Sequence, residues 1–191
     1  MNLIELRKHI DDIRWDDDFM PFYYNASLGM PDDVFDLVIL RYLDHDCKST
    51  YIDFELLKYC AERQHELAKN LIALSNRDRD LADCNKKKIL LYYKSKSPKD
   101  NLRQLWLLGY CYETFGLDYS ISRETENAYG PYCMVKAFEC FKKCADSNFP
   151  IGVKYAFYYC DNPQGYNIAI KNNETLLQKY RQKIIELHLD I

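Results

Sequence analysis

Apolar side chains recur at three- and four-residue steps along most of the chain. This spacing is typical of one face of an α-helix, and it differs from the two-residue alternation of a half-buried strand. The stripes predict helices over 33–43, 54–74, 102–112, 134–145 and 174–189. The pattern as a whole predicts an all-α fold of about nine short helices.

Residues that end helices separate these stripes. Ser, Asn, Gly and Pro gather at 27–31, 75–76, 95–98, 147–150 and 161–165, where we expect short connections. Residues 117–133 carry no clean apolar stripe, so a long loop is expected there. We expect the helices to form a single domain over 1–191.

The sequence also repeats itself. Residues 58–71 align with 142–155 at an offset of 84, so that Cys60 matches Cys144. A middle copy fits at an offset of 34 residues from the first copy. The other 50 residues of the 84-residue offset equal one more step of 34 plus about 16 residues. This excess is close to the length of the irregular stretch 117–133. A two-helix unit of about 34 to 36 residues is the period of tetratricopeptide-type solenoids.

Two sequence motifs within the repeat allow a comparison with a known repeat family. The first reads Leu108-Gly109-x-x-Tyr112-Glu113-x-x-Gly116-Leu117-Asp118. The second reads Lys136-Ala137-Phe138-x-x-Phe141-Lys142-Lys143-Cys144-Ala145-Asp146, with a further copy at Phe54-x-Leu56-Leu57-x-x-Cys60-Ala61-Glu62. These residues resemble the Sel-one-like repeats, a branch of the tetratricopeptide-like α/α solenoids. The resemblance covers about 54–160 and is strongest over 102–146.

The resemblance implies a right-handed α/α solenoid of about three to four two-helix repeats. The repeats would occupy 33–160, with the 117–133 loop inserted in one unit. The acidic segment 1–30 would lead in or cap one end, and 174–191 would form a C-terminal capping helix, because solenoids need terminal elements with a polar outer face.

In such a solenoid the first helix of each unit lines a concave groove. The resemblance implies that the small Gly109 lets the partner helix approach and that the seam is filled by Leu105, Tyr112, Ala137 and Phe141. The residues between Leu105, Gly109 and Tyr112 would then face the groove. The expected partner-binding residues are Lys69, Asn76, Arg103, Trp106, Tyr110 and Glu113. The equivalent positions in the following unit are Val153, Ala156 and Cys160.

Aromatic anchors flanked by charge are the composition that protein-binding hot spots favour. We therefore expect a non-enzymatic interaction module, an adaptor or scaffold that binds another protein or a peptide segment in the groove, without a cofactor. The 117–133 loop would be a second contact. The N-terminal aromatic residues could instead dock onto another copy of the chain, so a homo-oligomer stays open.

The charge is distributed unevenly. Residues 1–62 hold 14 acidic against 6 basic side chains, and residues 85–103 hold seven basic against one acidic. One alternative function is single-stranded RNA binding through 86–103, where lysines alternate with Tyr92, Tyr93 and, just beyond, Trp106. The net charge of −3 argues against a nucleic-acid partner.

A second alternative is a metal-dependent hydrolase. Asp44-His45-Asp46 and Asp16-Asp17-Asp18 are oxygen- and nitrogen-bearing clusters in the N-terminal third, and such groups can serve metal-assisted hydrolysis. Their spacing matches no calcium loop or zinc motif. No phosphate-binding Gly-rich loop or nucleophile elbow accompanies them, so we expect no metal ion and no enzyme activity.

Eight cysteines lie along the chain without a Cys-x-x-Cys pair. We expect reduced thiols that act as small buried hydrophobic groups. Cys140 and Cys144 share a helix face, and a redox pair or half a metal site is the alternative there.

Composition supports the all-α prediction. Six Gly and six Pro among 191 residues are too few for a β-sandwich or barrel, which needs turn residues every 8 to 12 positions or so. The chain is 48% hydrophobic and 29% charged, enough to build a core. No apolar run approaches the roughly 18 residues of a membrane span, and the charged start lacks a signal core, so we expect a cytoplasmic protein without a membrane partner.

Overall fold

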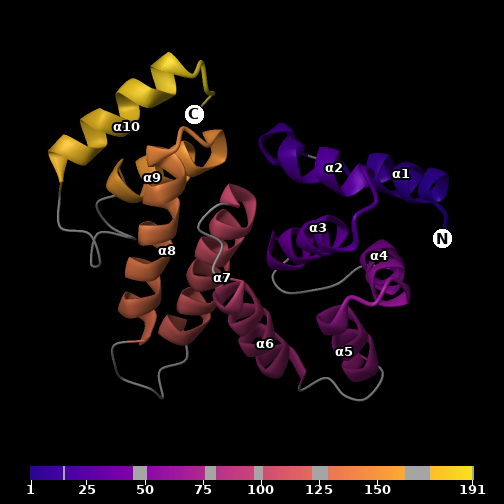
Figure 1. Cartoon of the computed structure of the whole chain (residues 1–191). Helices are drawn as coiled ribbons and strands as arrows, with labels where there is room; N and C mark the ends of the chain where they lie inside the picture. Colours follow the sequence, from indigo (N-terminus) through magenta and orange to yellow (C-terminus); the bar gives the residue numbers. More distant parts are fainter. Residues whose placement is uncertain are drawn as a thin grey trace. The chain divides into compact units, whose positions relative to one another are not determined.

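The computed structural model describes residues 1–14, 16–44, 51–75, 81–96, 101–121, 129–161 and 173–190, and they are all-α (Figure 1). The helices form two compact units, Met1–Ser95 and Lys96–Ile191, where the sequence predicted a single domain. No helix of the described part is long and apolar enough to cross a membrane.

The first unit holds six α-helices and one 3₁₀ turn within its described residues. They are α1 (Leu3–Asp12), η1 (Asp17–Phe19), α2 (Met20–Ser27), α3 (Pro31–Asp44), α4 (Tyr51–Glu62), α5 (Glu66–Ser75) and α6 (Leu81–Ser95). Each α-helix packs against its neighbour along the chain. The predicted helix over 33–43 is confirmed as α3.

The second unit holds four helices in its described part. They are α7 (Leu102–Ile121), α8 (Tyr129–Asp146), α9 (Pro150–Asp161) and α10 (Glu174–Glu186). Figure 1 shows α7 beside α8, and α8 also packs on α9, which in turn packs on α10. The helices predicted over 102–112, 134–145 and 174–189 are confirmed, with the last ending at Glu186.

The predicted helix over 54–74 is wrong in one respect, because a turn divides it into α4 and α5. The His65 N–H donates to the Cys60 carbonyl at 3.1 Å, and the Gln64 N–H donates to the Ala61 carbonyl at 3.1 Å. Gln64 has a positive φ of 70°. This pair of bonds is a Schellman motif, which closes a helix end and redirects the chain.

The same turn ends two helices of the second unit. Between α8 and α9, the Phe149 N–H donates to the Cys144 carbonyl, and Asn148 has a φ of 57°. After α10, the Leu189 N–H donates to the Ile184 carbonyl and the His188 N–H donates to the Ile185 carbonyl. His188 has a φ of 52°. Gln64 and Asn148 are 84 residues apart, so the offset found in the sequence marks two helix hairpins with the same local geometry.

The expected loop over 117–133 is shorter than predicted. Helix α7 continues to Ile121 and α8 already begins at Tyr129; residues 122–128 lie outside the described part. Pro131 is the third residue of α8, a position where the missing N–H costs nothing because the first-turn amides have no partner within the helix. The two turn-forming residues Gly130 and Pro131 therefore mark a helix start.

A buried ion pair joins α3 to α4. The Arg41 guanidinium bonds to the Asp53 carboxylate, and both side chains are almost fully buried. Arg41 also donates to the Ile13 carbonyl at 3.2 Å, just beyond α1. One arginine thus connects three helices of the first unit.

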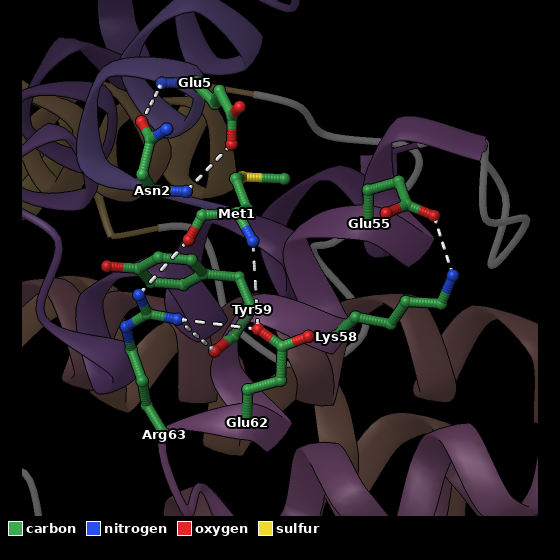
Figure 2. Close-up of polar contacts among 8 residues, drawn as sticks. All are labelled: Met1, Asn2, Glu5, Glu55, Lys58, Tyr59, Glu62 and Arg63. Carbon is green, nitrogen blue, oxygen red and sulfur yellow. Dashed lines mark hydrogen bonds and ion pairs between the residues drawn. The ribbon is translucent and has the colours of Figure 1, made fainter.

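Polar contacts of α4 also fix the N-terminal helices. The Tyr59 hydroxyl donates to the Gly29 carbonyl at 2.8 Å. Figure 2 shows the Arg63 guanidinium across the Tyr59 ring, 3.6 Å from its centroid, where it also donates to the Met1 carbonyl at 3.3 Å. Gly29 has a φ of 83°, and an added Cβ would lie 2.8 Å from Leu3, so both its conformation and its contacts require glycine.

The close approach of two helices that was expected at Gly109 is confirmed for α7 and α8. A Cβ on Gly109 would lie 2.7 Å from the Phe141 ring and 3.0 Å from the Cys140 Cβ, so the missing side chain lets α7 and α8 approach closely. Leu105, Tyr112 and Ala137, which were also expected in the seam, are buried.

We predict that replacing Asp53 by alanine lowers the free energy of unfolding by about 3–5 kcal/mol, because the Arg41 charge is left buried without its partner. Glu55 is the matched control on the same helix, since it forms a partly exposed i,i+3 pair with Lys58 (Figure 2). Glu55→Ala should cost about 0–1 kcal/mol. Denaturant unfolding measures both, and equal losses in the two variants would contradict the assignment.

We also predict that Gln64→Gly is more stable than Gln64→Ala by about 1 kcal/mol, because a positive φ penalises every residue with a Cβ. The alanine variant controls for loss of the Gln64 side chain, which contacts Lys69. Thermal or denaturant unfolding gives the difference. If alanine equals or exceeds glycine in stability, residue 64 does not hold the positive φ in solution.

Candidate functional site

Four of the six predicted partner-binding residues lie on α7 in the second unit. These are Arg103, Trp106, Tyr110 and Glu113. Lys69 lies on α5 in the first unit, and Asn76 lies outside the described residues. The structure therefore brings together one group of the predicted residues, on a single helix.

Trp106 was expected to face a groove, but its side chain is fully buried. Its ring centroid lies 5.0 Å from Tyr110, 5.1 Å from Tyr155 and 6.1 Å from Phe141. The repeat register alone placed Trp106 between the seam residues Leu105 and Gly109, toward the groove. The Tyr155 ring of α9 covers the indole from a second direction, so the buried face of α7 is wider than predicted.

Glu113 also differs from the expectation. It is 6% exposed, so its carboxylate lies within the second unit and not on an outer face. Arg103 and Tyr110 are half-buried, and both keep some surface that solvent or a partner can reach. Of the four α7 residues, these two remain accessible.

Three tyrosines form a continuous, partly exposed row above Trp106, which we call the tyrosine surface: Tyr110, Tyr155 and Tyr158. The Tyr110 and Tyr155 ring centroids are 5.9 Å apart, and those of Tyr155 and Tyr158 are 6.5 Å apart, both edge to face. Tyr158 is 41% exposed. Edge-to-face rings at this spacing stabilise each other, so the row is a preformed aromatic surface.

Helix α9 contributes to the tyrosine surface through residues other than those predicted. The residues predicted to face the groove, Val153, Ala156 and Cys160, are all buried. Their neighbours are the more accessible residues: Tyr155 is half-buried and Tyr158 is exposed. Successive side chains are rotated by about 100° around a helix axis, so an error of one or two positions in the repeat alignment exchanges the buried and exposed faces.

Lys69 makes local contacts within its own hairpin. Its ammonium bonds to the Gln64 side-chain oxygen, and it lies 2.9 Å from the Glu66 carboxylate. Exposed pairs of this kind contribute little to stability. Nothing in this geometry marks Lys69 as a binding residue.

The cysteines that the structure describes with their side chains are buried and form no disulfide bond. They are Cys60, Cys111, Cys133, Cys140, Cys144 and Cys160. Burial raises the pKa of the Cys140 and Cys144 thiols to about 12 and that of Cys160 to about 11. Thiols with such pKa values carry almost no thiolate near neutral pH, which makes them poor redox groups or nucleophiles.

The proposed metal cluster gains no support from the described residues. Asp16 accepts a hydrogen bond from the Asp18 N–H at 2.8 Å, and Asp17 pairs with Arg14 at 3.0 Å. His45 and Asp46 lie outside the described part. Over the described ranges, no group of three or more His, Cys, Asp or Glu side chains is arranged to hold a metal ion.

The RNA alternative needs accessible rings, and the described residues of 86–103 place theirs inward. Tyr93 is fully buried and donates to the Asp36 carboxylate at 2.8 Å. Tyr92 is half-buried, with its ring 5.4 Å from Phe35. Trp106 is buried as described above. Bases therefore have no row of exposed rings there on which to stack.

Family models, curated proteins and solved structures were compared with this chain, and none of them matches it. The likeness to the Sel-one-like repeats thus depends on the motif residues alone. The candidate site is accordingly defined by its geometry: a row of tyrosines supported by a buried tryptophan.

We predict that Cys140 and Cys144 react with a thiol reagent at pH 8 about 10²–10³ times more slowly in the folded protein than in denaturant, because the raised pKa removes the thiolate and burial blocks access. Alkylation followed by mass spectrometry measures each site. Rapid labelling of either cysteine in the folded protein would show a reactive thiol and reopen the redox alternative.

Proposed function

We propose that this protein is a non-enzymatic interaction module, an adaptor or scaffold, that binds a segment of a partner protein on the tyrosine surface of α7 and α9. The observation that carries the proposal is the row of half-exposed rings of Tyr110, Tyr155 and Tyr158 above the buried Trp106.

Tyrosine suits this role for a physical reason. Its ring offers a large apolar area and its hydroxyl a hydrogen bond, while only two side-chain torsions must be fixed on binding. Here Tyr155 is already held by Trp106 at 5.1 Å and by Phe141 at 4.9 Å. A surface ordered in advance loses little entropy when a partner binds.

The wider architecture supports the same function. Within the proposal, α3, α5, α7 and α9 are the first helices of two-helix units, and α4, α6, α8 and α10 are the second. The chain is then a right-handed α/α solenoid of three to four repeats, like the Sel-one-like family. The recurrence of one helix-ending turn after α4, α8 and α10 favours this repeat assignment.

The buried thiols favour a reducing compartment such as the cytoplasm, where cysteines stay reduced. The partner would be a peptide segment or a protein surface that offers apolar side chains to the rings and polar groups to the hydroxyls. No cofactor is part of the proposal.

A random-peptide phage library tests the proposal directly. Peptides selected on the wild-type protein should bind at least ten-fold more weakly to Tyr158→Ala and to Tyr110→Ala, the losses expected of hot-spot residues. Tyr132→Ala is the matched control, because Tyr132 is an exposed tyrosine like Tyr158, at 51% against 41%, but lies on α8. Thermal unfolding shows whether each variant keeps the fold.

Two outcomes contradict the proposal. One is that every selected peptide binds the folded Tyr158→Ala and Tyr110→Ala variants as tightly as the wild type. The other is that Tyr132→Ala weakens binding more than they do.

A further inference from the structure

The first unit contains a pocket of about 70 Å³ among α3, α4, α5 and α6. It belongs to neither the tyrosine surface nor the predicted groove residues. Its floor is apolar and almost fully buried, and is formed by Val38, Ile39, Leu57, Leu71 and Ile89. Three half-buried side chains, Tyr42, Phe54 and Asn85, form its rim.

The pocket is small but exceeds the volume of a water site. A dry apolar cavity of about 150 Å³ holds benzene. Half of that volume accommodates roughly three to four heavy atoms, which is the size of a branched aliphatic group such as isobutyl. The rest of a ligand would then extend past the rim.

One wall of the pocket carries an unused hydrogen-bond acceptor. The Asn85 side-chain oxygen, Oδ1, is buried and accepts no hydrogen bond from the described residues. Leaving such an atom unsatisfied costs about 1–3 kcal/mol. A ligand that brings an N–H or O–H to this point would relieve that penalty.

The charge in the pocket is balanced. Its one carboxylate, that of Asp53, is bonded to the buried Arg41 guanidinium. An ionised ligand group would add a third buried charge without a partner, which is strongly unfavourable. The site therefore favours a neutral ligand.

We propose that this pocket binds a neutral small molecule that carries an isobutyl-sized aliphatic group next to a hydrogen-bond donor. The aliphatic group occupies the floor between Leu57, Leu71 and Ile89. The donor bonds to Asn85 Oδ1 at the rim. This ligand site is independent of the peptide binding proposed for the second unit.

Two nearly isosteric probes test the site, N-isobutylacetamide and isobutyl acetate. They differ in one group, an N–H in the amide and an oxygen in the ester. NMR titration of the full chain should show shifts confined to the residues of α3–α6 that line the pocket. The amide should bind roughly five-fold more tightly, the effect of one neutral hydrogen bond.

Two variants locate the binding. Asn85→Leu should abolish the preference for the amide while the ester still binds, because the floor is intact. Leu57→Phe should fill the pocket and abolish binding of both probes. Asn85 lies on the rim, so the Asn85→Leu variant is expected to fold even if the Leu57→Phe variant does not. Circular dichroism shows whether each variant keeps its helical structure.

Three results would overturn the inference. The first is that neither probe, up to its solubility limit, changes the NMR shifts of the pocket residues. The second is that the ester binds as tightly as the amide. The third is that the folded Asn85→Leu variant still prefers the amide. None of these results bears on the tyrosine surface, which the phage-selected peptides test separately.

Discussion

The way that helices end constrains the rest of this structure. After α4, α8 and α10, two carbonyls of the last turn accept N–H groups from a residue of positive φ and from the residue that follows. This closure satisfies carbonyls that a helix end leaves without partners. After α4 and α8 the next helix begins two residues beyond the positive-φ position, so consecutive helices must fold back and share an apolar interface.

The consequence reaches the candidate site through α8 and α9. Their turn at Asn148 sets α9 against α8, close enough that a Cβ on Gly152 would collide with Cys144. That placement brings Tyr155 onto Phe141 and Trp106. The tyrosine surface is therefore a product of hairpin geometry: the turn positions α9, the packing buries Trp106, and the remaining ring area faces outward.

Much of this fold could be predicted from the sequence, because helical periodicity and seam packing are local. The stripes located most helices, and the small residue at Gly109 correctly indicated a close approach of α8. The split at Gln64 was missed because the apolar period continues across it. The helical ends at 117–121 and 129–133 were missed because Gly and Pro are tolerated near helix termini.

The site was harder to predict for a different reason. Periodicity identifies which residues share a face but not how many helices cover that face. Trp106 was placed outward because the repeat register assigned it to the groove, and the register does not record that Tyr155 of α9 covers the indole. Tyr155 and Tyr158 were missed because the register assigned their neighbours on α9 to the groove. The Arg41–Asp53 pair and the Asn85 pocket depend on contacts between helices, which no local pattern records.

In the proposed function, the tyrosine surface of α7 and α9 binds a partner segment. Hydrogen–deuterium exchange of the full chain, with and without a peptide selected on it, tests that claim most directly. The account predicts slower exchange in α7 and α9, with the helices of Met1–Ser95 unchanged. Protection confined to the first unit, or no protection in α7 and α9 at saturating peptide, would contradict it.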